Sequence, residues 1–70
     1  MPKPLAYHNM PKAIQNLVDG IEFLNHVERI KKDGKTVYKF VFRDSFEIWA
    51  RYYDGHGNKV SETPFLPIAS

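Results

Sequence analysis

Hydrophobic positions near the start of the chain follow a helical period. The apolar residues of this stretch have the i, i+3, i+4, i+7 spacing of one helix face: Ile14, Leu17, Val18 and Ile21. Asn9 is a suitable N-cap, proline is tolerated in a first turn, and Gly20 suits a left-handed position after the last turn. We therefore predict a short helix over residues 11–19. Residues 1–10 show no periodicity and are expected to form an extended arm.

The period changes to two in the middle of the chain, where Asp33-Gly34 separates two alternating runs. This dipeptide is the strongest short hairpin signal, and a two-residue turn there pairs Ile30 with Val37, His26 with Val41 and Glu28 with Lys39. One face of the hairpin is then apolar: Phe23, Val27, Tyr38, Phe40 and Phe42. Residues 21–32 also fit a continued helix through Leu24, Val27 and Ile30, but the hairpin favours a strand.

A third strand is predicted over residues 46–53, after a three-residue loop at 43–45. This loop length sets Phe42 opposite Phe46 and extends the apolar face through alternate residues: Phe46, Ile48, Ala50 and Tyr52. Trp49 then faces outward. A two-residue loop would instead turn Trp49 towards the core, so both orientations stay open.

The last part of the chain predicts a turn and a short edge strand. Residues 54–58 contain Asp54, Gly55, Gly57 and Asn58, all turn residues, and residues 59–62 could add a fourth strand. Pro64 and Pro67 exclude a regular ladder beyond it. The predicted fold is α+β, one short N-terminal helix packed on a three- to four-stranded antiparallel β-meander. It forms one domain over residues 1–70, with an arm at 1–10, a core at 11–63 and an extended tail at 64–70.

The composition narrows the class of protein. Seventy residues without cysteine make a disulfide-stabilised secreted domain the poorer expectation, and they exclude a thiol nucleophile and a cysteine zinc site. The sequence shows no signal peptide and no apolar run of about 20 residues, so we expect a cytoplasmic protein without membrane contact.

Candidate catalytic groups are sparse. His8, His26 and His56 fall on the arm, a strand and a glycine turn, which does not predict a metal site. The 54–58 loop lacks the remaining ligands of an EF-hand and the features of a phosphate-binding loop. His26, Glu28 and Lys39 could serve acid–base chemistry of the kind small ribonucleases and toxins use, but a flat sheet face offers no pocket. We expect no cofactor and a binding protein rather than an enzyme.

The predicted outer sheet face carries the residue types of binding hot spots. Trp, Tyr and Arg bury large areas on binding and keep polar tips. The proposed partner-binding set is Trp49, Tyr53, Arg51, Arg43, Lys39 and Val41. Alternatively, the arm or the tail folds over this face and buries it. The small size and the predicted architecture suit a small accessory regulator, such as those that phages and plasmids encode to inhibit or redirect a host protein.

The uneven charge supports a second hypothesis. Residues 29–43 hold six basic residues against one acidic, within a chain of net charge +2. Aromatic and basic side chains together can bind single-stranded nucleic acid. The candidate residues are Lys31, Lys32, Lys35, Lys39, Arg43, Arg51 and Trp49. The low net charge and the nearby acidic residues favour a protein partner, either a different protein or a second copy.

Overall fold

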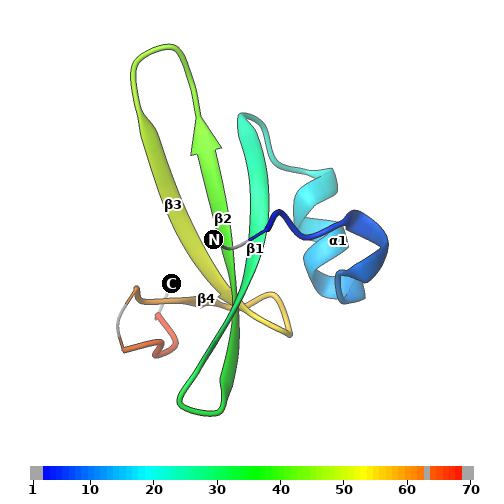
Figure 1. Cartoon of the computed structure of the whole chain (residues 1–70), viewed down its shortest axis with the longest axis vertical. Helices are drawn as coiled ribbons and strands as arrows, with labels where there is room; N and C mark the ends of the chain where they lie inside the picture. The colour runs from blue at the N-terminus through cyan, green and yellow to red at the C-terminus, as the bar shows by residue number, and fades with distance from the viewer. Residues whose placement is uncertain (1–2, 63, 69–70) are drawn as a thin grey trace.

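The computed structural model describes residues 3–62 and 64–68, which form an α+β fold with one short helix and one antiparallel sheet (Figure 1). The helix α1 spans Lys12–Asp19 and follows a 3-10 turn at Tyr7–Asn9. The strands are β1 (Leu24–Lys32), β2 (Lys35–Arg43), β3 (Ile48–Asp54) and β4 (Lys59–Val60), and their spatial order is β1-β2-β3-β4. The predicted fold class is confirmed, including a fourth strand that is shorter than residues 59–62.

The β1–β2 hairpin has the predicted register. Ile30 pairs with Val37, Glu28 with Lys39 and His26 with Val41, because the turn consists of Asp33 and Gly34, both at positive φ. One prediction was wrong at the far end of β1. An irregularity between Leu24 and His26 brings Leu24 opposite Phe42 and leaves Phe23 63% exposed.

The register between β2 and β3 differs from the prediction. The connecting loop has four residues, 44–47, and Phe42 pairs with Trp49 instead of Phe46. Because the shift is an odd number of residues, the two faces of β3 are exchanged. Trp49, Arg51 and Tyr53 therefore share a face with Phe42, Phe40 and Tyr38, their direct partners. The predicted core positions of this strand were wrong, and Phe46 is 95% exposed.

The core lies between α1 and this face of the sheet. Ile14 is the buried residue of α1 and joins a cluster of sheet side chains: Val27, Tyr38, Phe40, Phe42 and Tyr53. The predicted helix face is confirmed, since Leu17, Val18 and Ile21 pack against this cluster. The helix termini differ from prediction: Pro11 is the N-cap in place of Asn9, and Gly20 ends the helix at φ −106°, outside the left-handed region.

The two ends of the chain contact different parts of the sheet. The N-terminal arm runs beside the outer edge of β1, where the Leu5 N–H donates to the Val27 carbonyl at 2.7 Å. The tail returns across the other face, where Val60 bridges Pro67 and Phe65 lies 5.9 Å from the ring of Tyr52. The tail thus covers the end of that face near the β1–β2 turn, and Val37 and Val60 are buried.

Candidate interaction surface

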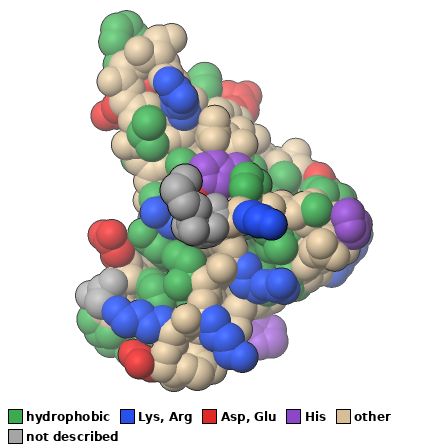
Figure 2. Space-filling model, viewed as in Figure 1, with side chains coloured by type: hydrophobic (Ala, Val, Ile, Leu, Met, Phe, Trp, Pro, Cys, Tyr) green, Lys and Arg blue, Asp and Glu red, His purple; other side chains and the backbone are tan. Residues whose placement is uncertain are grey.

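The most exposed apolar side chains gather where β2 and β3 are joined. Phe46 in the connecting loop is 95% exposed, Ile48 at the start of β3 is 64% exposed, and Phe23 beside them is 63% exposed. The Phe23 carbonyl accepts a hydrogen bond from the Arg43 N–H at 3.0 Å, which places Phe23 at the end of β2. This end of the sheet projects beyond the rest of the molecule in Figure 1, and Figure 2 shows hydrophobic side chains at its tip. We call Phe23, Phe46 and Ile48 the hairpin-tip patch.

Asp44 fixes the loop that presents this patch. Its Oδ1 accepts hydrogen bonds from the backbone N–H groups of Phe46 at 2.8 Å and Glu47 at 2.9 Å. These two bonds hold the pKa of Asp44 below its usual value. The Asp44 N–H also donates to the Glu47 carbonyl at 3.1 Å. The loop is therefore tied by its own hydrogen bonds while Phe46 points into solvent.

Trp49 is partly withdrawn from the surface by its aromatic neighbour. Its ring stacks on Phe42, with centroids 5.5 Å apart and planes 6° from parallel. The Arg51 guanidinium lies over the same Phe42 ring, 5.1 Å from its centroid. Trp49 is half-buried and packs against the core, so of the two orientations that the sequence left open the structure has the inward one.

The predicted partner-binding set does not form one surface. Trp49, Arg51 and Tyr53 face the helix side, and Tyr53 is buried. Their strand neighbours Lys39, Val41 and Arg43 point to the opposite face by the alternation of β2. The hairpin-tip patch was missed because the predicted register placed Phe46 and Ile48 in the core.

The basic residues proposed for nucleic acid are also divided. Lys31 lies on the helix side of the sheet with Arg51 and Trp49, whereas the other four lie on the opposite side: Lys32, Lys35, Lys39 and Arg43. Arg29, Lys31, Thr36 and Tyr38 line a hollow of about 480 Å³. One face of the Trp49 ring is already occupied by Phe42. This arrangement brings some positive charge together but provides no open aromatic platform beside it.

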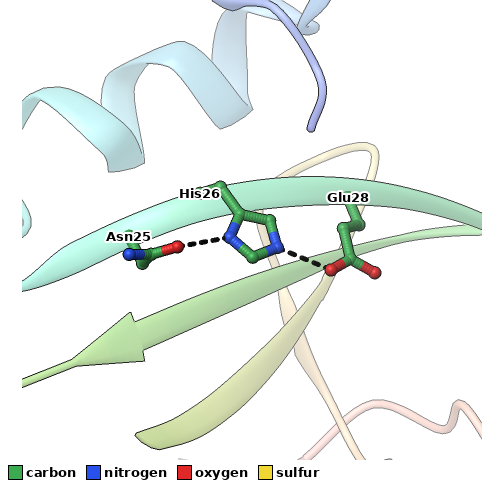
Figure 3. Close-up of polar contacts among 3 residues, drawn as sticks. All are labelled: Asn25, His26 and Glu28. Atoms are coloured by element: carbon green, nitrogen blue, oxygen red, sulfur yellow. Dashed lines mark hydrogen bonds and ion pairs between the residues drawn. The ribbon is translucent and has the colours of Figure 1, made fainter. Parts of the chain in front are cut away.

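His26 forms a polar group with two neighbours on β1, shown in Figure 3. Its Nε2 lies 2.6 Å from Glu28 Oε2, and its Nδ1 lies 2.6 Å from Asn25 Oδ1. Both ring nitrogens are therefore occupied by polar side chains of the same strand. The predicted cross-strand register of Glu28 with Lys39 is confirmed, but the Glu28 carboxylate contacts His26 and makes no ion pair with Lys39.

The two edges of the sheet differ in their protection. At the β1 edge, the Leu5 N–H donates a hydrogen bond to the Val27 carbonyl, and three basic side chains are exposed: Arg29, Lys31 and Lys32. Charged side chains and covering segments discourage pairing at an edge. At β3, the strand β4 pairs only with Tyr52 and Tyr53, so the first half of β3 forms an edge without a neighbouring strand in the part of the chain that the structure describes.

Two further classes of site have no support among residues 3–62 and 64–68. No helix there is long and apolar enough to cross a bilayer. No group of three or more histidine, cysteine or acidic side chains is arranged to hold a metal ion within the same residues.

The chain matches no protein-family model, no curated protein and no solved structure.

Proposed function

We propose that this chain is a small non-enzymatic protein-binding module, and that its contact surface is the hairpin-tip patch. The observation that carries the proposal is the 95% exposure of Phe46 at the end of a projecting hairpin. Ile48 and Phe23 beside it are also more than half exposed. Grouped large apolar side chains on a surface mark sites of protein contact, whereas single ones need no explanation.

The loop geometry supports the same function. A binding side chain loses less conformational entropy on association when its backbone is already ordered. Asp44 provides this order through its bonds to the N–H groups of Phe46 and Glu47. The charged residues around the patch, Arg43, Asp44 and Glu47, form a polar rim of the kind that orients a partner.

The polar group on β1 favours binding over catalysis. A general base needs a nitrogen that is free to take a proton from a substrate. Both nitrogens of His26 are bonded to side chains of the same strand. A role as a regulator or inhibitor of another cytoplasmic protein fits the size and the cysteine-free composition, and belongs to the proposal.

Site-specific photo-crosslinking tests the proposed surface. A photoreactive phenylalanine analogue replaces Phe46, whose exposure leaves room for the added group, and the control carries the analogue at Asn16 on the exposed side of α1. We expect protein adducts in cell extract from position 46 and not from the control. The substitution Ile48→Thr in the same chain should reduce their yield severalfold. Equal adducts from both positions, or none, would refute the proposal.

The nucleic-acid alternative has its own measurement. Labelled single-stranded oligonucleotides are titrated at low and physiological salt, because phosphate contacts weaken steeply as salt rises. Binding that persists at physiological salt and is lost in Arg29→Ala or Lys31→Ala would support the alternative over a protein partner. These two residues are chosen because they line the same hollow.

A further inference from the structure

The free half of β3 presents backbone groups that are ready to pair. The Asp54 N–H donates to the Asn58 carbonyl at 2.9 Å, so the backbone of Asp54 points towards β4. Alternation along the strand directs the N–H and C=O groups of Ile48 and Ala50 to the same side. The strand β4 has already ended at Val60, opposite Tyr52. Within residues 3–62 and 64–68, these outward groups have no strand partner.

We infer that this edge pairs with the same edge of a second copy of the chain, so that two sheets join as one across a twofold axis. The inference rests on the proposed function, for which it names the partner. The register centred on Trp49 places Ile48 opposite Ala50 of the second copy, and their outward backbone groups meet. It also places Glu47 opposite Arg51 of the second copy, and the twofold axis repeats this pair.

The two opposite-charge pairs distinguish this register from its neighbours. Glu47 and Arg51 are both exposed, and neither makes an ion pair within the described part of the chain. Opposite charges that face each other across an antiparallel pair stabilise it, and like charges oppose it. A register centred on Ala50 would require the backbone groups of Ile48 to pair with those of Tyr52, which already face Val60 of β4. A register centred on Ile48 would place Glu47 opposite Trp49 and lose both pairs.

The same register gives Phe46 a place to pack. A hollow of about 340 Å³ lies beside the free half of β3, bounded by residues that include Tyr52, Ser61 and Ile68. In the register centred on Trp49, β3 of the second copy begins with Ile48 opposite Ala50, and the loop before it brings Phe46 towards this hollow. Phe46, which is 95% exposed, would then meet Ile68, an apolar side chain that is itself 45% exposed.

A charge-exchange experiment tests the second copy directly. Sedimentation equilibrium of the purified chain, from about 1 µM to about 1 mM, measures the dimer dissociation constant. Glu47→Arg and Arg51→Glu each replace the two opposite-charge pairs of the dimer with two like-charge pairs. Each variant should therefore raise the dimer dissociation constant about tenfold. An equimolar mixture of the two variants sets two opposite-charge pairs and should recover wild-type association. A mixture that associates no better than its components would overturn the register.

A proline pair tests the edge itself. Ala50→Pro removes an outward N–H without removing a bond of the monomer, and it should abolish dimerisation with the fold kept. Arg29→Pro is the matched control. The backbone carbonyl of Val27 points outward from β1, the protected edge, and by alternation the backbone groups of Arg29 do the same. A dimer that survives Ala50→Pro, or a chain that stays monomeric at every concentration, would overturn the inference. In that case, adducts crosslinked at position 46 whose mass differs from that of two chains would still support the proposed function, with a different protein as the partner.

Discussion

The contact between Trp49 and Phe42 supports a quantitative prediction, because it exists only in the observed register of β2 and β3. The perturbation is a double-mutant cycle with Trp49→Leu and Phe42→Leu, which removes each ring but keeps an apolar side chain. The two rings are 5.5 Å apart and almost parallel. Aromatic pairs in this range contribute about 0.5–1.5 kcal/mol beyond the area they bury. The loss of unfolding free energy in the double variant should therefore fall short of the sum of the single losses by about 0.5–1.5 kcal/mol.

Urea denaturation followed by far-ultraviolet circular dichroism measures all four proteins, since the cycle removes the only tryptophan. With a urea slope of about 1 kcal/mol per molar for a chain of this size, the coupling corresponds to about 0.5–1.5 M in the transition midpoint. A fixed concentration of sucrose in all samples stabilises the folded state, so that the least stable variant is still folded without urea and its transition can be measured.

The control cycle combines Trp49→Leu with Ile30→Ala. Ile30 lies on the opposite face of the sheet and pairs with Val37, far along the strands from Trp49. These two changes should be additive within about 0.3–0.5 kcal/mol. Additivity in the Trp49 and Phe42 cycle as well would refute the register, because the rings would not be in contact.

Three further predictions concern single residues. Ile14 is 0% exposed, so Ile14→Ala should cost about 2–5 kcal/mol, close to the whole stability of a domain this small, and Ile14→Val about 0.5–1.5 kcal/mol, both measured in urea. Asp44→Asn should lower the free energy of unfolding at neutral pH, where the Asp44 carboxylate is charged. The difference between the variant and wild type should disappear as the pH falls below 3.8 and then through the lowered pKa of Asp44, because the carboxylate becomes neutral. Burial and then the carboxylates of Glu62 and Glu28 raise the pKa of Tyr52 above its usual value of 10.0, so the folded state holds this proton longer and stability should fall as pH rises past that value. Tyr52→Phe should make thermal unfolding less sensitive to alkaline pH, and an unchanged alkaline profile would contradict this.

Local patterns in the sequence were sufficient for the helix and the first hairpin. Ile14 and its three companions repeat on one helix face, and Asp33-Gly34 admits a single turn length, so the register of β1 and β2 follows. Phe23 was misplaced because the irregularity brings Leu24, in place of Asn25, opposite Phe42 and so exchanges the faces of Phe23 and Leu24, and the sequence has no glycine or other signal there.

The candidate surface could not be predicted because it depends on one loop length. Asp44 accepts hydrogen bonds from residues two and three positions ahead, and this side-chain bonding makes a four-residue loop. Strands alternate their faces at every residue, so the lengthened loop exchanged Trp49 with Ile48. The aspartate followed by serine at 44 and 45 was the available signal, since both residues favour such turns.

The strand order has a consequence for how quickly the chain folds. Every strand of the sheet is hydrogen-bonded only to its neighbours in the sequence, so each new pairing closes a loop of a few residues. Small loops cost little entropy to close, and domains built from local contacts cross their folding barrier faster than those with distant pairings. The bond from Leu5 to Val27 spans most of the first half of the chain and can form after the hairpins. We therefore expect sheet formation to proceed by zippering outward from the Asp33-Gly34 turn, with the arm added last.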